Sequence, residues 1–304
     1  MGDVVTDLWH EVQAGKALSE ALHMHSRVFP VFYQNMVKSG EYSGVLPLVM
    51  ERLASFLEDE HELKGFLLSS MLYPAMVSLV SLGAFGVIIF YVLPRFEKVF
   101  TMMRQEVPLI TRLVLGFSGF LLKWWWLIVA LIAGSVISFF VYLKSPGGKE
   151  KVDKWYLKIP LFGELYLKVQ TARMARTFST MLSGGVPILK ALTILQESLS
   201  NTVLARAISE VRTSLREGGS IARELRKQAV FPPVAVHMID IGEESSNLEG
   251  MLEKLARLYD AEVKNTVKGL LSILEPAVIL TLALGIFVML IAILIPMMRL
   301  NSVM

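Results

Sequence analysis

The chain has 304 residues, a formal net charge of +3 and no cysteine, and 54% of its residues are hydrophobic. This hydrophobic fraction is too high for one ordinary soluble domain, and the small, scattered charge argues against nucleic acid as a partner. Without cysteine the chain can form no disulfide, no cysteine-based zinc site and no thiol nucleophile.

The apolar residues are concentrated in three blocks that contain no Asp, Glu, Lys, Arg or His. These blocks cover 72–92, 124–143 and 276–298. Each is about as long as the ~20 residues that cross a bilayer, so we expect an all-α membrane protein with three transmembrane helices. No window alternates with period two, so no β-sheet is expected. Residues 1–70 lack a basic-then-apolar leader, which predicts that no signal peptide is cleaved.

In residues 1–70, which precede the first apolar block, the pattern predicts short helices over 3–25, with a break at Gly15, and a further helix after Pro30. Gly40 is expected to end that helix as a left-handed cap, and Ser43 to cap the next helix. The acidic run 58–62 is expected to be a solvated charged turn, with binding of a cation or a basic partner as the alternative.

The chain is expected to enter the membrane at Tyr73 and Pro74, where proline interrupts the backbone ladder and predicts a kink or a restart. Pro94 is expected to mark the far end of this span. A mixed stretch follows as a linker, and three tryptophans at the start of the next block suit a membrane interface.

The second soluble stretch shows clear helix signals. An amphipathic helix over 165–182 ends at Gly184, a new helix begins after Pro187, and Asn201 caps another. The pattern predicts an antiparallel bundle of about six helices with short connections.

One stretch occurs twice, because residues 39–46 reappear as 241–248 at a displacement of 202 positions. The same displacement relates the flanking residues from Val28 to Pro94 to a second set, so we interpret the chain as a tandem duplication. We call the two stretches 39–46 and 241–248 the boxes. Their candidates for partner contact or for a structural role are Gly40, Glu41, Gly44, Leu46, Gly242, Glu243, Ser245 and Leu248. The candidates at the entry to the membrane are Tyr73, Pro74, Glu275 and Pro276.

Two spans separate the repeated soluble parts, so both are expected on the same side of the membrane. The lysines between 144 and 158 favour a cytoplasmic location, whereas the basic residues between 95 and 112 oppose it. We therefore expect a first cytoplasmic bundle repeat over 1–70, transmembrane helices over 71–94, 121–143 and 271–298, a periplasmic linker over 95–120, a second cytoplasmic bundle repeat over 144–270 and a short tail over 299–304.

No residue pattern predicts catalysis, a cofactor or a metal. Residues 147–150 lack the spacing of a phosphate-binding loop, and the histidines show no ligand pattern. Glu41 and Glu243 are each expected at a helix amino-terminus, where the backbone dipole favours a carboxylate; contact with a partner is the alternative. Glu275 is expected to pair with another subunit or to lie among the lipid headgroups.

The paired boxes, the Tyr-Pro and Glu-Pro dipeptides, and the motifs at 145–149, 159–163 and 182–187 resemble the general secretion pathway F and type IV pilus assembly C proteins. The resemblance implies an inner-membrane platform protein that binds a cytoplasmic ATPase and couples it to insertion or extraction of pilins or pseudopilins. It also implies that the protein contacts other inner-membrane assembly proteins, forms homo-oligomers and is not an enzyme. Family members carry helices like those over 165–199 in both copies. Since these have no counterpart before residue 8, the first repeat is expected to be incomplete.

Two other functions fit a membrane-bound helical chain. An oligomeric transporter or channel is disfavoured because the three blocks contain no ionisable residue, and ion or substrate paths usually require one. A membrane-anchored helical adaptor for another partner is the second alternative.

Overall fold

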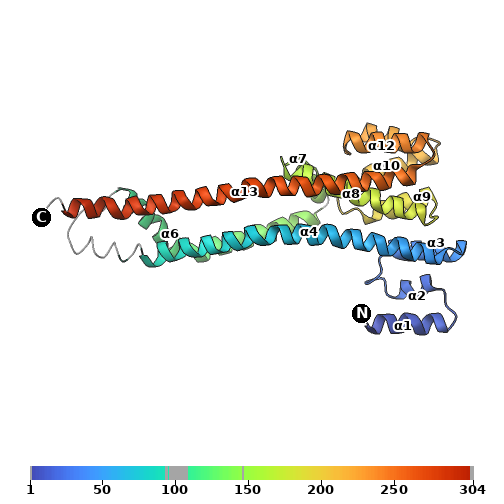
Figure 1. The fold of residues 1–304 in the computed structure, drawn as a ribbon, viewed down its shortest axis with the longest axis horizontal. Helices are drawn as coiled ribbons and strands as arrows, with labels where there is room; N and C mark the ends of the chain where they lie inside the picture. Colours follow the sequence, from blue (N-terminus) through green and yellow to red (C-terminus); the bar gives the residue numbers. More distant parts are fainter. Residues whose placement is uncertain (1, 93–94, 96–108, 146, 302–304) are drawn as a thin grey trace. The chain divides into compact units, whose positions relative to one another are not determined.

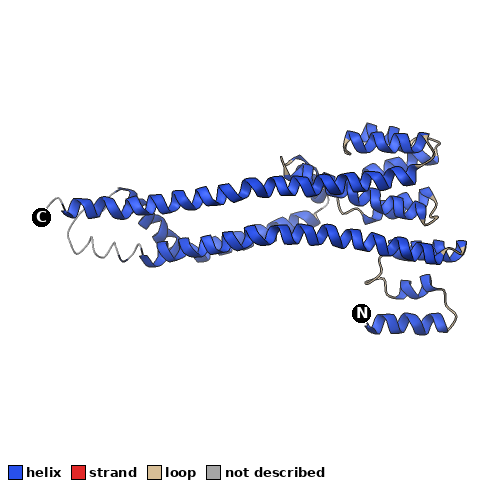
Figure 2. Ribbon diagram, in the orientation of Figure 1, coloured by secondary structure: helices blue, strands red, loops and turns tan. Residues whose placement is uncertain are grey.

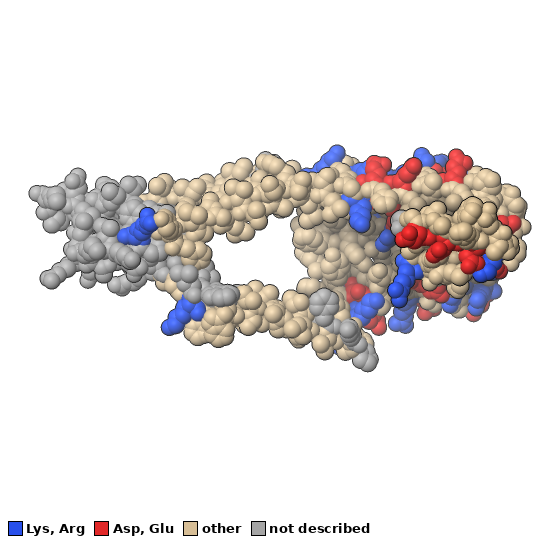
Figure 3. All heavy atoms as spheres, turned by 90° about the horizontal axis from the view of Figure 1, so that it is seen from below, with Lys and Arg blue, Asp and Glu red and all other residues tan. Residues whose placement is uncertain are grey.

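The computed structural model describes residues 2–92, 95, 109–145 and 147–301, and these residues form helices joined by short turns, with no strand among them (Figures 1 and 2). The chain divides into two units. The first comprises Met1–Phe66 and Ser145–Thr266, and the second comprises Leu67–Lys144 and Val267–Met304. Charged side chains gather on the first unit, whereas the described surface of the second is almost free of them on the face shown in Figure 3.

The amino-terminal part of the first unit consists of three short helices and the start of a long one. The break predicted at Gly15 is confirmed, because this residue has φ +87° and lies between the first two helices. The helices are α1 (Gly2–Gln13), α2 (Leu18–Met24), α3 (Val31–Ser43) and α4 (Leu46–Val87).

The second part of the first unit has seven helices among the described residues. The predicted boundaries at Gly184, Pro187 and Asn201 are confirmed, and Oδ1 of Asn201 accepts hydrogen bonds from two backbone N–H groups of the next helix at 3.0 and 3.2 Å. The helices are α7 (Gly148–Lys158), α8 (Phe162–Ser183), α9 (Ile188–Ser198), α10 (Thr202–Arg216), α11 (Ile221–Gln228), α12 (Pro233–Glu244) and the first part of α13 (Leu248–Asn301).

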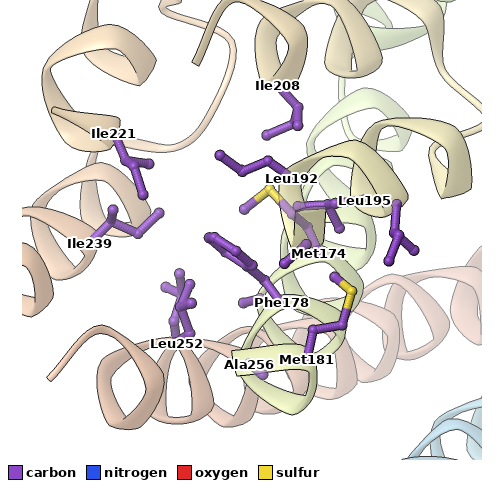
Figure 4. Packing of buried hydrophobic residues seen from close by; sticks show 14 of the residues in the cluster. Met174, Phe178, Met181, Leu192, Leu195, Ile208, Ile221, Ile239, Leu252 and Ala256 are labelled. Carbon is purple, nitrogen blue, oxygen red and sulfur yellow. The ribbon is translucent and has the colours of Figure 1, made fainter. Parts of the chain in front are cut away.

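The core of this unit is built around α8, whose buried residues Met174, Phe178 and Met181 follow helical spacing along one face. In Figure 4 the ring of Phe178 lies among side chains of α9, α12 and α13, including Leu192 and Leu252. Burying one such large side chain stabilises the fold by roughly 1.5–3 kcal/mol. The cluster also includes buried residues of α3 and α4, so one continuous core serves the whole unit.

The second unit contains the rest of α4, the π-helical turn η1 (Ile88–Val92), α6 (Leu109–Lys144) and the rest of α13. By length and composition, Leu46–Val87 and Leu248–Phe287 can each cross a membrane. A third candidate combines Val129–Leu143 with α7 across a bend, so the described residues offer two or three spans.

At three of the predicted boundaries the described residues are helical. At Pro74, where a kink or a restart is predicted, α4 continues as one helix, so the chain does not restart there. The last part of the predicted linker over 95–120 is helical, since α6 begins at Leu109. The predicted tail begins inside α13, which continues to Asn301. Pro94 lies outside the described residues.

Candidate functional site: two glutamate boxes and a charged cleft

The carboxylate of Glu41 caps a neighbouring helix. It accepts hydrogen bonds from the backbone N–H groups of Leu18 and Ser19 at 2.6 and 3.2 Å, and from Oγ of Ser19 at 2.6 Å. These N–H groups belong to the first turn of α2, where the helix supplies no acceptor of its own. The side chain therefore joins the end of α3 to the start of α2.

Glu243 makes the same kind of cap in the second box. It accepts hydrogen bonds from the backbone N–H groups of Ile221 and Ala222, both at 2.8 Å, and from Oγ of Ser220 at 2.7 Å. Here the glutamate joins the end of α12 to the start of α11. In each box the carboxylate thus accepts from the first two backbone N–H groups of a neighbouring helix.

The predicted location of these glutamates was therefore wrong in one respect. Each lies in the last turn of its own helix, α3 or α12, and its carboxylate reaches the amino-terminus of a different helix. The error arose because α3 continues to Ser43 instead of ending at Gly40.

Gly40 and Gly242 are packing positions inside helices. A Cβ atom on Gly40 would come within 2.8 Å of Cγ2 of Val49, and one on Gly242 within 3.1 Å of Cα of Leu248 and Cβ of Met251. The missing side chain of Gly40 thus makes room for the close approach of α3 to α4, and that of Gly242 for the approach of α12 to α13. The cap predicted at Gly40 is instead Gly44, which has φ +70°.

The serines of the two boxes hydrogen-bond within their own helices. Oγ of Ser43 donates to the carbonyl of Ser39 at 2.7 Å, and Oγ of Ser245 donates to the carbonyl of Ile241 at 2.6 Å. Ser43 therefore does not cap the next helix as predicted. Leu46 and Leu248 begin α4 and α13 and pack, partly buried, against the core.

A charged cleft of about 390 Å³ lies between α4, α8 and α13 of the first unit. Its wall carries both signs of charge at close range. The charged residues that line it include Asp59 and Glu62 from α4, Arg176 from α8, and Arg257, Asp260 and Lys264 from α13.

Ion pairs join the acidic run of α4 to the helices opposite. Arg176 bonds Asp260 and lies 3.3 Å from Asp59. One turn earlier on α8, Arg173 pairs with Glu60 at 2.8 Å, and Lys264 of α13 pairs with Glu62 at 2.6 Å. The run predicted as a solvated turn is thus helical and has basic partners within the chain.

The Arg176–Asp260 pair is the least exposed of these contacts, with 9% and 18% of the two side chains accessible. Burial raises the pKa of the Asp260 carboxyl above its ordinary value, and nearby Asp59 adds to the rise, although Arg176 opposes it. Oδ1 of Asp260 is buried and has no hydrogen-bond partner within the described part of the chain. At the open side, the hydrogen bond from Lys264 lowers the pKa of Glu62.

The residues predicted at the membrane entry belong to the second unit. Tyr73 and Pro74 line a cavity of about 170 Å³ together with residues of α13 such as Ser272 and Val278. Pro276 lies within α13, as does Glu275, whose side chain is outside the described part of the structure.

Sequence reasoning missed Arg176, Asp260 and Lys264. A signal for Arg176 was present, since it lies on the apolar face of α8 between Ala172 and Ser179, where a charge requires a partner. Among the described residues, no group of three or more His, Asp or Glu is placed to hold a metal ion.

The sequence matches one family model and is similar to proteins of pilus assembly and of type II secretion. The family model described as "Type II secretion system (T2SS), protein F" matches residues 1–94 and 174–296. The type IV pilus assembly protein TapC of Aeromonas hydrophila is 34% identical, over 99% of this chain and 72% of its own length. The type IV pilus assembly protein PilC of Pseudomonas aeruginosa is 32% identical, over 100% and 81%. The type II secretion system protein F of the same species is 31% identical, over 96% and 72%.

Proposed function

Because the chain belongs to the family of type II secretion system protein F, we propose that it is the inner-membrane platform of a secretion or pilus assembly machine. In this role it couples a cytoplasmic ATPase to the insertion or extraction of pilins or pseudopilins. The observation that carries the proposal is similarity over nearly the whole chain to proteins named for both machines.

The proposed architecture is a tandem duplication with three membrane spans and both bundles in the cytoplasm. Matching backbone contacts support the duplication. The N–H of Val45 donates to the carbonyl of Gly40 at 3.0 Å, and the N–H of Asn247 donates to that of Gly242 at 3.0 Å, at the same displacement of 202 residues. The family model also matches two separate parts of the chain.

Continuous helices provide the proposed route for mechanical coupling. α4 and α13 each begin in the charged unit and continue, without a break in their described residues, into the apolar unit. A hydrogen-bonded helix transmits rotation and translation along its axis, since its backbone ladder resists bending. Movement that the ATPase imposes on the bundles thereby reaches the membrane segments, where other copies of the chain, other assembly proteins and pilins are the proposed partners.

We assign the two box glutamates to structure rather than to partner contact. Both carboxylates already accept three hydrogen bonds within the chain. A partner that used them would first break these caps, so the ATPase contact is proposed for other exposed surfaces.

Labelling tests the orientation. The chain has no cysteine, so Tyr42→Cys and Ser245→Cys each create a single thiol at an exposed position. A membrane-impermeant maleimide should leave both unlabelled in intact cells and label both in inside-out vesicles. Labelling of the two positions from opposite sides would overturn the shared cytoplasmic location.

Co-purification tests the partner. The chain should retain the ATPase of its own machine after detergent extraction, and it should release no phosphate from ATP when that ATPase is absent. A chain that hydrolyses nucleotide alone, or that retains no ATPase while the pilus or secreted product still forms, would contradict the platform role.

A further inference from the structure

The segment 148–162 presents basic and large apolar side chains to solvent. α7 carries lysines at 149, 151, 154 and 158, and Trp155 between them is 64% exposed. Lys151, Trp155 and Lys158 follow the i, i+4, i+7 spacing that places side chains on one face of a helix. A basic helix with an indole on the same face has the composition of a helix that lies on a membrane surface.

A strained corner follows α7. Leu161 has φ +67° and ψ −54°, and the N–H of Phe162 donates to the carbonyl of Pro160 at 2.8 Å. This is a γ-turn of the rarer positive-φ kind, which costs backbone energy in any residue with a side chain. Leu161 and Phe162 are each 59% exposed, so the strained backbone holds two large apolar side chains in solvent.

The rest of the structure fixes this corner in place. The N–H of Gly163 donates to the carbonyl of Ile159 at 2.8 Å, and Gly163 is buried. Tyr156 packs edge-on against Tyr166 of α8 with ring centroids 4.9 Å apart. The apolar tip is therefore held by contacts within the chain, which argues for a binding role rather than for a fraying loop end.

The acidic side chains of α7 are engaged within the chain. Glu150 pairs with Lys154 at 2.6 Å. Asp153 accepts hydrogen bonds from the backbone N–H and Oγ1 of Thr202 at 2.8 and 2.7 Å, which caps α10. The exposed charge that remains is chiefly that of the lysines, so the surface is complementary to anions.

The chain length limits how far this surface lies from the preceding apolar helix. α6 ends at Lys144 and α7 begins at Gly148. The intervening residues can span about 14 Å at most. If α6 crosses the bilayer, α7 therefore begins within the headgroup layer or just outside it.

We propose that α7 and the 160–162 corner form a membrane-contact surface, in which Trp155, Leu161 and Phe162 enter the interface and the lysines bind anionic lipid headgroups. Indole rings and apolar tips are stable at that depth, and each lysine near an anionic surface adds attraction. The inference rests on α6 as a membrane span and goes beyond the platform role. It does not depend on the ATPase.

Single-cysteine probes test this surface in the full chain, reconstituted in vesicles of phosphatidylcholine and phosphatidylglycerol. A polarity-sensitive fluorophore is attached at Trp155→Cys or Phe162→Cys, and its quenching by spin-labelled lipid is measured. Ile132→Cys, in the middle of α6, is the control for the span. Tyr42→Cys, at an 83% exposed side chain of α3, is the aqueous control.

Quenching at 155 and 162 should be closer to that at 132 than to that at 42. Replacing Lys151 and Lys158 with Gln should reduce it by about twofold or more in anionic vesicles and change it little in neutral ones. Probes at 155 and 162 that are quenched no more than the probe at 42, while 132 is quenched, would overturn the proposal and leave the corner to a protein partner. A probe at 132 that escapes lipid quenching would overturn the span and this inference with it.

Discussion

Glu62 and Lys264 are 202 residues apart, the displacement that relates the two copies of the repeated stretch, and their side chains pair with each other at 2.6 Å. Positions that match at this displacement can meet only near a local two-fold relation between the two helices that carry them. Other residues at this displacement also share a cavity: Ser55 with Arg257 in the charged cleft, and Ser70 with Ser272 in the cavity of the second unit. In each unit, residues of α4 and α13 at this displacement thus line the same cavity.

Exchanging the two charges tests this pairing. Glu62→Lys alone should place two ammonium groups together, Lys264→Glu alone two carboxylates, and each should lower the thermal unfolding midpoint in detergent. The double exchange should recover most of that loss, because it restores opposite charges at the same place. Since both side chains are partly exposed, the effects should be small and should shrink in high salt. A double variant less stable than either single one would contradict the contact.

The buried arginine should matter far more than its exposed neighbour. Arg176→Met removes the partner of Asp260 and leaves a carboxylate in a poorly solvated place, which should destabilise the fold by about 2–4 kcal/mol. Arg173→Met is the matched control, because it lies one turn away on α8 and 58% of its side chain is exposed in its pair with Glu60. Its cost should stay below about 1 kcal/mol. Equal losses in the two variants, measured by thermal or denaturant unfolding, would show that the buried pair stabilises the fold no more than the exposed one.

Asp260 should also contribute to the pH dependence of the folding stability. Burial raises its pKa in the folded chain above the ordinary value, so the folded state holds this proton more tightly than the unfolded state does. The resulting stabilisation is present below the ordinary pKa and is lost as the pH rises through the raised one. Asp260→Asn removes this dependence. The unfolding midpoint of the variant minus that of the natural chain should therefore be more positive at about pH 7 than at about pH 4, and the opposite trend would show that Asp260 is not shifted upward.

Much of the helical framework followed from local chemistry in the sequence. Gly15, Pro187 and Asn201 mark boundaries because a left-handed glycine, a proline at a helix start and an asparagine cap act over a few residues. The partners of the box glutamates and of Arg176 could not be predicted from such local signals. Leu18 lies 23 residues before Glu41, and Asp260 lies 84 residues after Arg176, so both contacts depend on tertiary packing. The role of Gly40 was missed for the same reason, since it depends on where Val49 lies.

The overpacking caused by a side chain at Gly40 should be relieved by a second substitution that shortens Val49. Gly40→Ala introduces a Cβ atom 2.8 Å from Cγ2 of Val49, and this overpacking should cost about 1–3 kcal/mol. Val49→Ala alone leaves a cavity, because Val49 is fully buried. Combined, the two changes should cost clearly less than the sum of their separate effects. Strict additivity in thermal unfolding would show that the glycine serves the backbone rather than the approach of α3 to α4.

The caps made by the box glutamates should be measurable one helix at a time. Glu243→Ala leaves the first backbone donors of α11 without their acceptor, and loss of such a cap costs about 1–2 kcal/mol. Hydrogen exchange should therefore accelerate at the amides of Ile221 and Ala222 by roughly tenfold, with little change in α8. Glu244→Ala, an exposed neighbour on the same turn, is the control and should leave these amides unchanged. Glu41→Ala should have the same local effect at Leu18 and Ser19, because the geometry is equivalent. If exchange at these amides stayed at its original rate while binding of the ATPase was lost, the two glutamates would be partner contacts and not helix caps.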